Sequence, residues 1–479
     1  MIHVDIAIVG AGTAGMPAAI EAATAGARVV VIEQSDRIGG TLHVSAGQMS
    51  GAGTRLQQSR GIADSPAEHL ADAMRISRDT CNVALVGKAT ELAGDTIDWL
   101  MGHGFDVDPA CPAILHLHEA YRVARTYWGR DGGRSILNVL RPLFEAAMAL
   151  PNAELRMATE AQSLLTGPDG AVIGLRLRDA RTGAETTLLA DRVVLATGGY
   201  GGNPAMFARM TAAYPLYTPA LTTSTGHGIV MAETLGAEVR YAEHFIPTFA
   251  GIEEAGQPGR VVWEHLPSLT PQVRQPWEIF VGQDGRRFVR EDSDSVDARE
   301  RALMGQPGLT FWTVFDDAIL RDAPPLLPGW TAAELAEAWT TSPSFVHAQT
   351  LEELAARTGI DAGNLAATLA ACNHARTIGA PDAFGRQHRP CAIGTAPFRA
   401  IRMHGIVLKT PAGLAVNEEM NVLDTHGAPI VNLYAIGEAI GGATLSGNSF
   451  VSGMSVTPAL AFGRWLGRRL AERRVEVAA

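Results

Sequence analysis

Three glycines near the start of the chain have the spacing of a phosphate-binding turn. Gly10, Gly12 and Gly15 follow an apolar segment and precede an alanine-rich segment that is predicted to be helical. The first glycine permits the tight turn, the second lets the backbone approach a pyrophosphate, and the third lets the helix pack on the strand. A second apolar segment, residues 28–32, ends at Glu33, whose carboxylate can accept hydrogen bonds from ribose hydroxyls. The arrangement predicts FAD or NAD rather than NADP.

Two tyrosines and two arginines within a short stretch could move a proton or hold an anion. Tyr121 and Tyr127 can act as a base only if a neighbouring cation lowers the pKa of the phenol, and Arg122 and Arg125 are close enough in sequence to do this. Arg125 could instead form a bidentate pair with a flavin phosphate or a substrate carboxylate. The alternative is that these aromatic side chains only pack a joint between domains.

His244 is the other candidate base, because an imidazole titrates near neutral pH. The alternative is a histidine whose hydrogen bonds are satisfied within a hinge. Lys409 is either a surface charge or an anchor for a substrate anion. His116 and His118 alternate as on a strand, and no metal site is expected there. The acidic run is predicted to be a solvated loop; it contains Glu291, Asp292, Asp294 and Asp297.

The composition is that of a globular protein with more than one domain. The chain has 479 residues, which is too long for one core, and 47% of them are hydrophobic. The net charge of −11 argues against a nucleic-acid partner. The four cysteines are far apart and form no CxxC pair, so they favour reduced thiols over a zinc site or disulfides. Neither a secretion signal nor a membrane-spanning run is visible, so we expect a cytoplasmic protein without membrane attachment.

Periodicity and turn residues predict alternating strands and helices. Helices are expected over 64–104, from residue 134, and over 331–341, 350–357, 361–376 and 458–474. Strands are expected at 153–158, 171–178, 185–189 and 192–197. The nucleotide-binding segments lie at both ends of the chain, and a block of different composition lies between them. We therefore expect an α/β fold, in which a discontinuous Rossmann-like FAD-binding domain (1–244 and 377–479) carries an inserted α+β capping domain (245–376).

The order of several motifs resembles the fumarate reductase/3-ketosteroid Δ1-dehydrogenase family of flavoproteins. Besides the first turn, the motifs lie at residues 39–40, 45–47, 195–199, 225–228, 285–289, 435–438 and 458–463. The resemblance implies a FAD-binding domain with a cap, and hydride transfer between the flavin and a carbon–carbon bond next to an activating group.

The same resemblance and the first turn together predict the cofactor-binding residues. They are Gly10, Gly12, Ala14, Gly15, Glu33, Gly39, Gly40, Thr41, Ser45, Ala46, Gly47, Thr197, Gly198, Gly437, Glu438, Ser455 and Val456. Thr41 stands where histidyl-linked members of the family carry their histidine, which implies that FAD is bound non-covalently.

Departures from the family pattern bear on the substrate. Four positions differ from the pattern of fumarate reductases. Ile246 and Lys409 stand where those enzymes carry histidines, Ser295 stands where they carry an arginine proton donor, and Phe450 stands where they carry another arginine. A dicarboxylate needs such cations, so the departures argue against fumarate or succinate.

Residues 287–297 and 452–458 are closer to the ketosteroid dehydrogenase side of the family. The tyrosine base of that side is absent near Ser295, however, and Ser449 stands where a ketone-binding tyrosine would fall. A steroid substrate therefore does not follow from the resemblance.

The resulting prediction is a FAD-dependent dehydrogenase that removes hydride and proton from the CH–CH bond α,β to a ketone and forms an enone. The ketone is expected to be cyclic, a keto acid or steroid-like. Backbone N–H groups near Gly453 are predicted to polarise the carbonyl. The alternatives are an ene-reductase of the fumarate reductase type and a flavin-holding protein without chemistry. The sequence does not identify the electron acceptor. It is compatible with a homo-oligomer as well as with a monomer.

Overall fold

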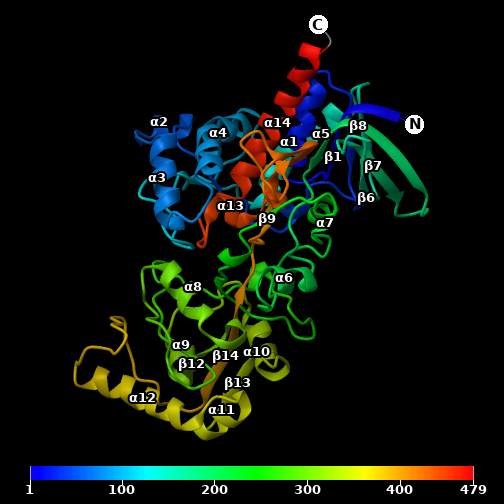
Figure 1. The fold of residues 1–479 in the computed structure, drawn as a ribbon. Helices are drawn as coiled ribbons and strands as arrows, with labels where there is room; N and C mark the ends of the chain where they lie inside the picture. Colours follow the sequence, from blue (N-terminus) through cyan, green and yellow to red (C-terminus); the bar gives the residue numbers. More distant parts are fainter. Residues whose placement is uncertain (1, 478–479) are drawn as a thin grey trace.

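The larger half of the molecule is built on an eight-stranded sheet, which the computed structural model shows within the described residues 2–477 (Figure 1). Its strands follow the order β16-β17-β8-β1-β2-β5, and β6 and β7 continue from β8 as a hairpin. The five strands from β17 to β5 in this order run parallel, whereas β16 is antiparallel to β17. The strands are β1 Ile2–Val9, β2 Val29–Ile32, β5 Ala153–Arg156, β6 Thr159–Thr166, β7 Val172–Asp179, β8 Glu185–Leu195, β16 Asn421–Leu423 and β17 Pro429–Ala435. The predicted parallel α/β core is confirmed.

The two ends of the chain meet on this sheet through closely packed helices. Helix α1 (Gly15–Thr24) lies against the C-terminal helix α14 (Val456–Val477). A Cβ at Gly463 would lie 2.4 Å from the carbonyl oxygen of Ala14, and a Cβ at Gly467 would lie 2.3 Å from that of Ala18. Only glycine allows this approach, which joins the two sequence ends as predicted.

The helical stretch predicted at 64–104 is two helices, α3 (Pro66–Ser77) and α4 (Val83–Gly102). Arg78 and Asp79 between them adopt positive φ angles of 55° and 57°, which end the first helix. The side chain of Asn82 then caps α4 by accepting a hydrogen bond from the backbone of Leu85.

The second half contains a smaller antiparallel sheet of order β10-β14-β12-β11, with β13 paired to β14. Figure 1 shows it below the first sheet, with helices around it. Its elements are β10 Thr248–Gly251, β11 Ile279–Val281, α8 Val296–Met304, β12 Thr310–Asp316, α9 Asp317–Asp322, α10 Ala332–Thr341, β13 Phe345–Ala348, α11 Leu351–Thr358, α12 Ala362–Thr377 and β14 Phe398–Ile406. The predicted helices of this block are confirmed within one residue.

The structure moves the predicted boundary of the second half. Strand β14 pairs with β12 from Phe398 to His404, although the sequence prediction assigned residues 377–479 to the FAD-binding domain. Two separate hydrophobic clusters agree with the pairing, because the second extends from Ala250 to Met403, and the first contains only Leu309 from that range and then continues from Val407. We therefore place the return to the first half near residue 406.

Two further predictions needed correction. The strands expected at 185–189 and 192–197 are one strand, β8, and β6 was not predicted. Three of the four acids in the run after β11 are not solvated, since Glu291, Asp292 and Asp297 are at most 4% exposed; only Asp294 is exposed as predicted. Arg287 and Arg290 supply partners to the first two, and Arg301 to the third. These arginines remove the need for solvent around the carboxylates.

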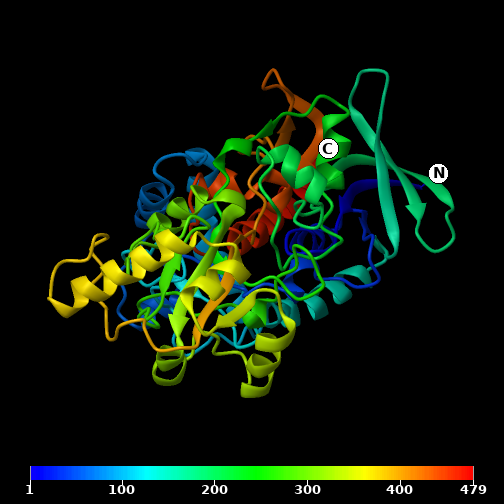
Figure 2. The ribbon, with the colours of Figure 1, turned by 90° about the horizontal axis from the view of Figure 1, so that it is seen from below.

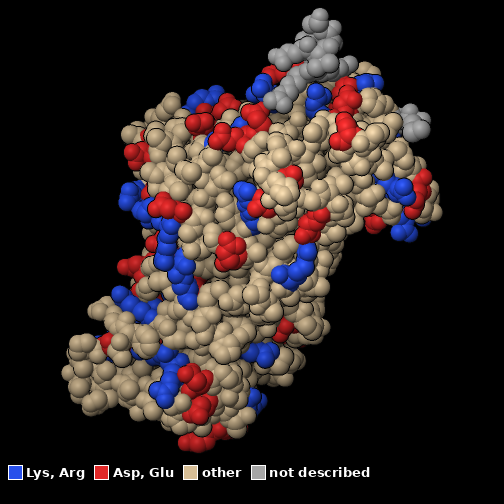
Figure 3. All heavy atoms as spheres, viewed as in Figure 1, with Lys and Arg blue, Asp and Glu red and all other residues tan. Residues whose placement is uncertain are grey.

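Short elements connect the larger ones and project from them. They are η1 Gly40–His43, β3 Met49–Ser50, α2 Arg55–Ser59, β4 Thr126–Tyr127, α5 Gly133–Met148, α6 Pro204–Met210, α7 His227–Glu233, β9 Val239–Arg240, η2 Ala242–His244, η3 Trp263–His265, η4 Pro307–Leu309, β15 Gly413–Leu414, η5 Gly437–Ile440 and α13 Gly442–Ser446. Figure 2 shows the β6–β7 hairpin projecting from one side. None of the described helices combines the length and apolarity needed to cross a bilayer. Acidic and basic side chains are interspersed on the face in Figure 3.

Candidate functional site

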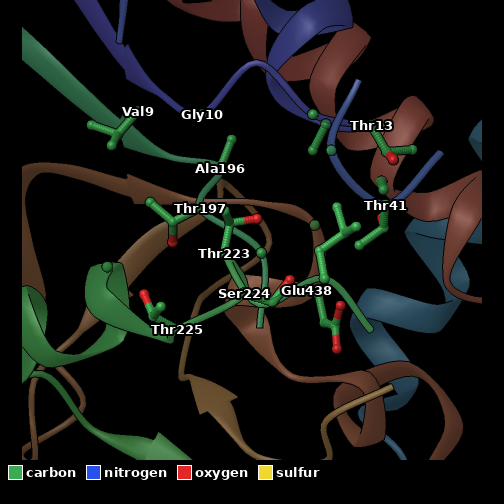
Figure 4. Close-up of a pocket in the computed structure, with 18 of the residues that line it drawn as sticks. Val9, Gly10, Thr13, Thr41, Ala196, Thr197, Thr223, Ser224, Thr225 and Glu438 are labelled. Atoms are coloured by element: carbon green, nitrogen blue, oxygen red, sulfur yellow. The ribbon is translucent and has the colours of Figure 1, made fainter. Parts of the chain in front are cut away.

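A cavity of about 780 Å³ opens at the carboxyl ends of β1, β2 and β8. Its wall includes Val9 and Ile32, the last residues of β1 and β2, and Ala196 directly after β8. Figure 4 shows side chains from the first turn, the end of β8, residues 223–225 and η5 facing one space. Dinucleotides bind at this edge of open parallel sheets.

The three glycines of the first turn have different geometric roles. Gly10 has a φ of +107°, and a Cβ there would lie 2.4 Å from the carbonyl oxygen of Ala196. A Cβ on Gly15 would lie 1.8 Å from the carbonyl oxygen of Gly10. A Cβ on Gly12 would meet no atom closer than 3.9 Å, and Gly12 lines the cavity. Gly10 and Gly15 are therefore required by packing, and Gly12 by the space for a ligand.

Glu33 is held rigidly at the cavity wall. Its Oε2 accepts a hydrogen bond of 2.8 Å from the backbone of Ala11, and its Oε1 accepts bonds from the backbone and hydroxyl of Ser35. A carboxylate has further lone pairs, so a ribose hydroxyl can still donate to it. Its position agrees with the role predicted for it.

The remaining wall also fits FAD. The Oγ1 atom of Thr197 is buried without a hydrogen-bond partner, and a Cβ built on Gly198 would meet no atom within 4 Å. An unsatisfied hydroxyl and an open backbone approach are what a polar ligand would use. The predicted residues that line this cavity are Gly10, Gly12, Ala14, Glu33, Gly40, Thr41, Ser45, Thr197, Gly198, Gly437, Glu438, Ser455 and Val456.

A second cavity, of about 140 Å³, lies against the first. The residues shared by both walls are Thr41, Ser45, Ser224, Leu408, Lys409, Glu438, Ser455 and Val456. The predicted cofactor residues Ala46 and Gly47 line only this second cavity, together with Trp263 from η3 and Phe450. Gly15 and Gly39 are not among the described residues that line either cavity. A molecule in the smaller cavity would therefore lie next to a cofactor in the larger one.

Lys409 is the one lysine or arginine among the described residues that line the second cavity. Its Nζ is buried without a hydrogen-bond partner and lies 4.3 Å from the ring centroid of Phe450. Burial lowers the pKa of Lys409 to about 7, although Glu300 and Glu438 oppose the shift. The lysine can therefore gain or lose a proton near neutral pH.

A carboxyl and an imidazole lie close to Lys409. The Oε1 of Glu300, on α8, is 4.0 Å from Nδ1 of His118, and both side chains are buried. His118 lines the second cavity and stacks on Phe450 at a centroid distance of 3.5 Å. Burial raises the pKa of Glu300 to about 8 and lowers the pKa of His118 to about 3. The sequence prediction missed Glu300, because nothing in its local pattern shows that α8 brings this carboxyl group beside His118.

Comparison with known proteins agrees with this geometry. The sequence pattern of a family described as "FAD binding domain" matches residues 5–453. The chain belongs to this family. The chain is 29% identical over 98% of its length to "Probable fumarate reductase Ifc3" of Shewanella frigidimarina, of which it covers 75%. It is 24% identical over 96% of its length to "3-oxosteroid 1-dehydrogenase" of Mycolicibacterium smegmatis, of which it covers 95%.

A solved structure gives the same assignment. The open conformation of a flavocytochrome c3 fumarate reductase superposes with a TM-score of 0.76 at 27% identity, covering 98% of this chain and 78% of the other. The predicted resemblance, the FAD cofactor and the enzyme class are confirmed: this family member is an FAD-dependent oxidoreductase of the CH–CH class.

Three predicted catalytic side chains lie elsewhere than expected in this flavoprotein. Tyr121, Arg125 and Tyr127 are at most 3% exposed, and none is among the described residues that line either cavity. The hydroxyl of Tyr121 donates to the carbonyl of Ser452 at 2.6 Å, and that of Tyr127 bonds to Thr54. Burial raises the pKa of both phenols, and for Tyr121 it outweighs the opposite effect of Arg125. We do not propose either tyrosine as the base.

Tyr121→Phe and Tyr127→Phe are expected to keep bound FAD and turnover. Each should lose about 1 kcal/mol of stability, because the hydroxyl of Tyr127 makes one buried hydrogen bond and that of Tyr121 makes one short and two long ones. Thermal melts and initial rates per bound flavin check both variants. A fall in rate of about 100-fold with FAD intact would restore the sequence-based assignment of a tyrosine base.

The two other predicted catalytic residues differ in position. Gly453 lines the second cavity, has a φ of +74° and would carry a Cβ 2.3 Å from the backbone nitrogen of Ser50. Close packing thus requires glycine there, whichever group its backbone meets. His244 is not among the described residues of either wall, and its Nε2 lies 3.5 Å from Glu243. Its Nδ1 is buried without a hydrogen-bond partner, so the alternative of a histidine satisfied within a hinge is not supported either.

Replacing Lys409 by methionine is expected to stabilise the protein at pH 7 by about 1–3 kcal/mol, because it removes a buried amine with no ion-pair partner. The pKa of Lys409 is lowered from 10.5 to about 7, so above pH 7 the unfolded chain binds more protons than the folded one. Wild-type stability from this group therefore rises with pH over that window. Melts of Lys409→Met and wild type at pH 7 and pH 9 should show the gain shrinking at pH 9, while Lys88→Met gains nothing at either pH.

Proposed function

We propose that this flavoprotein exchanges two hydrogens across a carbon–carbon bond α,β to a single carbonyl group. The observation that carries the proposal is the small cavity beside the FAD cavity. Lys409 belongs to both walls, and it is the one lysine or arginine among the described residues that line the smaller cavity. The first candidate reaction is the one predicted from the sequence, desaturation of a ketone to an enone.

The chain's own residues would hold the substrate and move its proton. Bound FAD supplies the site that accepts or gives hydride. Lys409, which lines the cavity, would bind the activating oxygen through Nζ or exchange the proton at the α-carbon. Trp263 and Phe450 would exclude water from the same space, which strengthens the contact between Nζ and oxygen.

The size of the cavity supports a compact substrate. Its volume of about 140 Å³ is small beside the ~300–1,000 Å³ common for sites that enclose drug-sized ligands. A one-ring or shorter acyclic carbonyl compound is therefore a better match than a steroid.

Reduction of a conjugated double bond is the second candidate. Glu300, with its pKa raised to about 8, keeps a proton at neutral pH and lies beside His118. A stored proton is what saturation of a double bond consumes. The names of the relatives include both a reductase and a dehydrogenase, so they support the bond type more than the direction.

Anaerobic mixing of the FAD-loaded protein tests both candidates. Bleaching of the flavin by a saturated cyclic ketone supports desaturation, and reoxidation of the reduced protein by the matching enone supports reduction. No redox exchange with ketones, enones, or saturated and unsaturated acids would overturn the proposal and favour a flavin-holding protein. Non-covalent attachment of FAD is part of the proposal, and acid precipitation should release all flavin into the supernatant.

A further inference from the structure

Lysine is rare in this chain. Only two of its 39 lysines and arginines are lysines, Lys88 and Lys409. Lys88 is partnered, since its Nζ donates to the carbonyl of Glu418 at 2.6 Å and lies 3.2 Å from the ring centroid of Trp465. Lys409 is the one that lies unpartnered in a cavity wall. Arginine keeps a fixed charge whereas lysine can release its proton, so the residue type suits a site whose charge changes.

The charged neighbours of Lys409 leave its ammonium without a direct counter-ion. Four titratable side chains lie near it: Glu300 of α8, Glu438 of η5, Cys81 before α4, and His118 of the loop between α4 and β4. Glu438 Oε1 already accepts two bonds from Thr410, at 2.7 and 2.8 Å. Glu300 is 4.0 Å from His118, and no carboxylate among the described residues forms an ion pair with Nζ.

An anionic ligand would complete this site. A buried ammonium without a counter-charge is unfavourable, and a neutral ketone would leave it in that state. One carboxylate supplies the missing charge and can accept hydrogen bonds from Nζ. A dicarboxylate would bury a second anion, for which the described wall offers no further lysine or arginine.

We propose that the substrate is a small monocarboxylate whose carboxylate pairs with Lys409 Nζ, so that the bond α,β to this carboxyl group lies toward the FAD cavity. The inference rests on the proposed function and specifies its substrate class. The saturated acid would lose one hydrogen from each of the α and β carbons to give the unsaturated acid, with FAD as the oxidant, or the reverse would occur with reduced FAD.

Binding of such an anion is expected to take up a proton. The pKa of about 7 in the empty cavity leaves Lys409 largely neutral at pH 8, and a carboxylate at Nζ would restore its charge. Glu300, with its pKa raised to about 8, also takes up part of a proton at pH 8 when an anion binds nearby, so the contribution of Lys409 is the uptake of wild type in excess of that of Lys409→Met. A neutral ligand of the same shape should cause no uptake.

Titration calorimetry of the oxidised holoprotein in two buffers with different ionisation enthalpies measures this uptake. The probes are 1-cyclohexene-1-carboxylate, 2-cyclohexen-1-one and fumarate. We expect proton-coupled binding of the monocarboxylate alone, weakened about 30-fold or more in Lys409→Met. Lys88→Met should bind as wild type. Lys409→Arg keeps a fixed charge, so any binding it shows should be accompanied by clearly less proton uptake than in wild type, which separates charge from titration if the methionine variant folds poorly.

Tighter binding of fumarate or of the enone, or proton uptake in Lys409→Met that is as large as in wild type, would overturn the inference. The proposed function fails separately. If the ketone and enone exchange electrons with the flavin while the monocarboxylate does not bind, the substrate class is wrong and the function stands. If the monocarboxylate binds with proton uptake but no probe exchanges electrons, the anion site stands and the function is wrong.

Discussion

Gly15→Ala is expected to yield little folded protein and no bound flavin. The new Cβ would lie 1.8 Å from the carbonyl oxygen of Gly10 and 3.3 Å from the Cβ of Ala196, so α1 would have to move away from β1 and β8. Both contacts belong to the closely packed core, where such overpacking costs about 3 kcal/mol or more. Soluble yield, the thermal midpoint and flavin absorbance after reconstitution measure the effect.

Gly12→Ala is the matched control, because the same methyl group is added three residues away without a clash. Its Cβ would meet nothing closer than 3.9 Å and would point into the cavity. The variant should fold with a change in stability within about 0.5 kcal/mol, and its affinity for FAD should fall about 10- to 100-fold. If Gly12→Ala unfolds and Gly15→Ala binds FAD, the roles assigned to the two glycines are reversed.

The parts of the site that sequence reasoning predicted are those fixed by local geometry. Gly10, Gly12 and Gly15 act through backbone contacts within one strand–turn–helix unit, and Glu33 ends the next strand. Spacing along the chain is enough to define such a unit. The cofactor, the α/β fold and the capping block followed from the same kind of pattern, and the comparisons confirm the first two.

The substrate side could not be predicted in the same way. Glu300, His118, Lys409 and Phe450 come from distant segments, and only the packing of the two halves brings them together. The pairing of the segment after the predicted boundary at residue 377 depends on the same kind of long-range packing. Whether residues 398–406 pair with the first or the second sheet depends on partners about 90 residues away in sequence, and both sheets accept an apolar strand.

Arg125→Met is expected to destabilise the protein by about 3–5 kcal/mol while the rate per bound flavin in the folded fraction stays near that of wild type. The Arg125 side chain is fully buried. Its Nε and Nη2 donate to Asp64 at 3.0 and 2.8 Å, and Nη1 donates to Asp72 at 3.0 Å. Gln57 still donates to Asp64, and Arg75 to Asp72, but neither replaces the buried charge beside Asp64. Denaturant unfolding measures the loss.

Arg122→Met is the natural control, because sequence reasoning gave Arg122 and Arg125 the same role. The side chain of Arg122 is 68% exposed and lies 3.8 Å from Asp72, so its loss should cost less than about 1 kcal/mol. Adding Asp64→Leu to Arg125→Met should recover part of the stability, since the double variant no longer buries an unpaired carboxylate. A stable Arg125→Met protein that has lost FAD or turnover would instead support the pairing with a phosphate or carboxylate that the sequence left open. The contrast between the two arginines is one of burial, which their neighbouring positions in the sequence do not reveal.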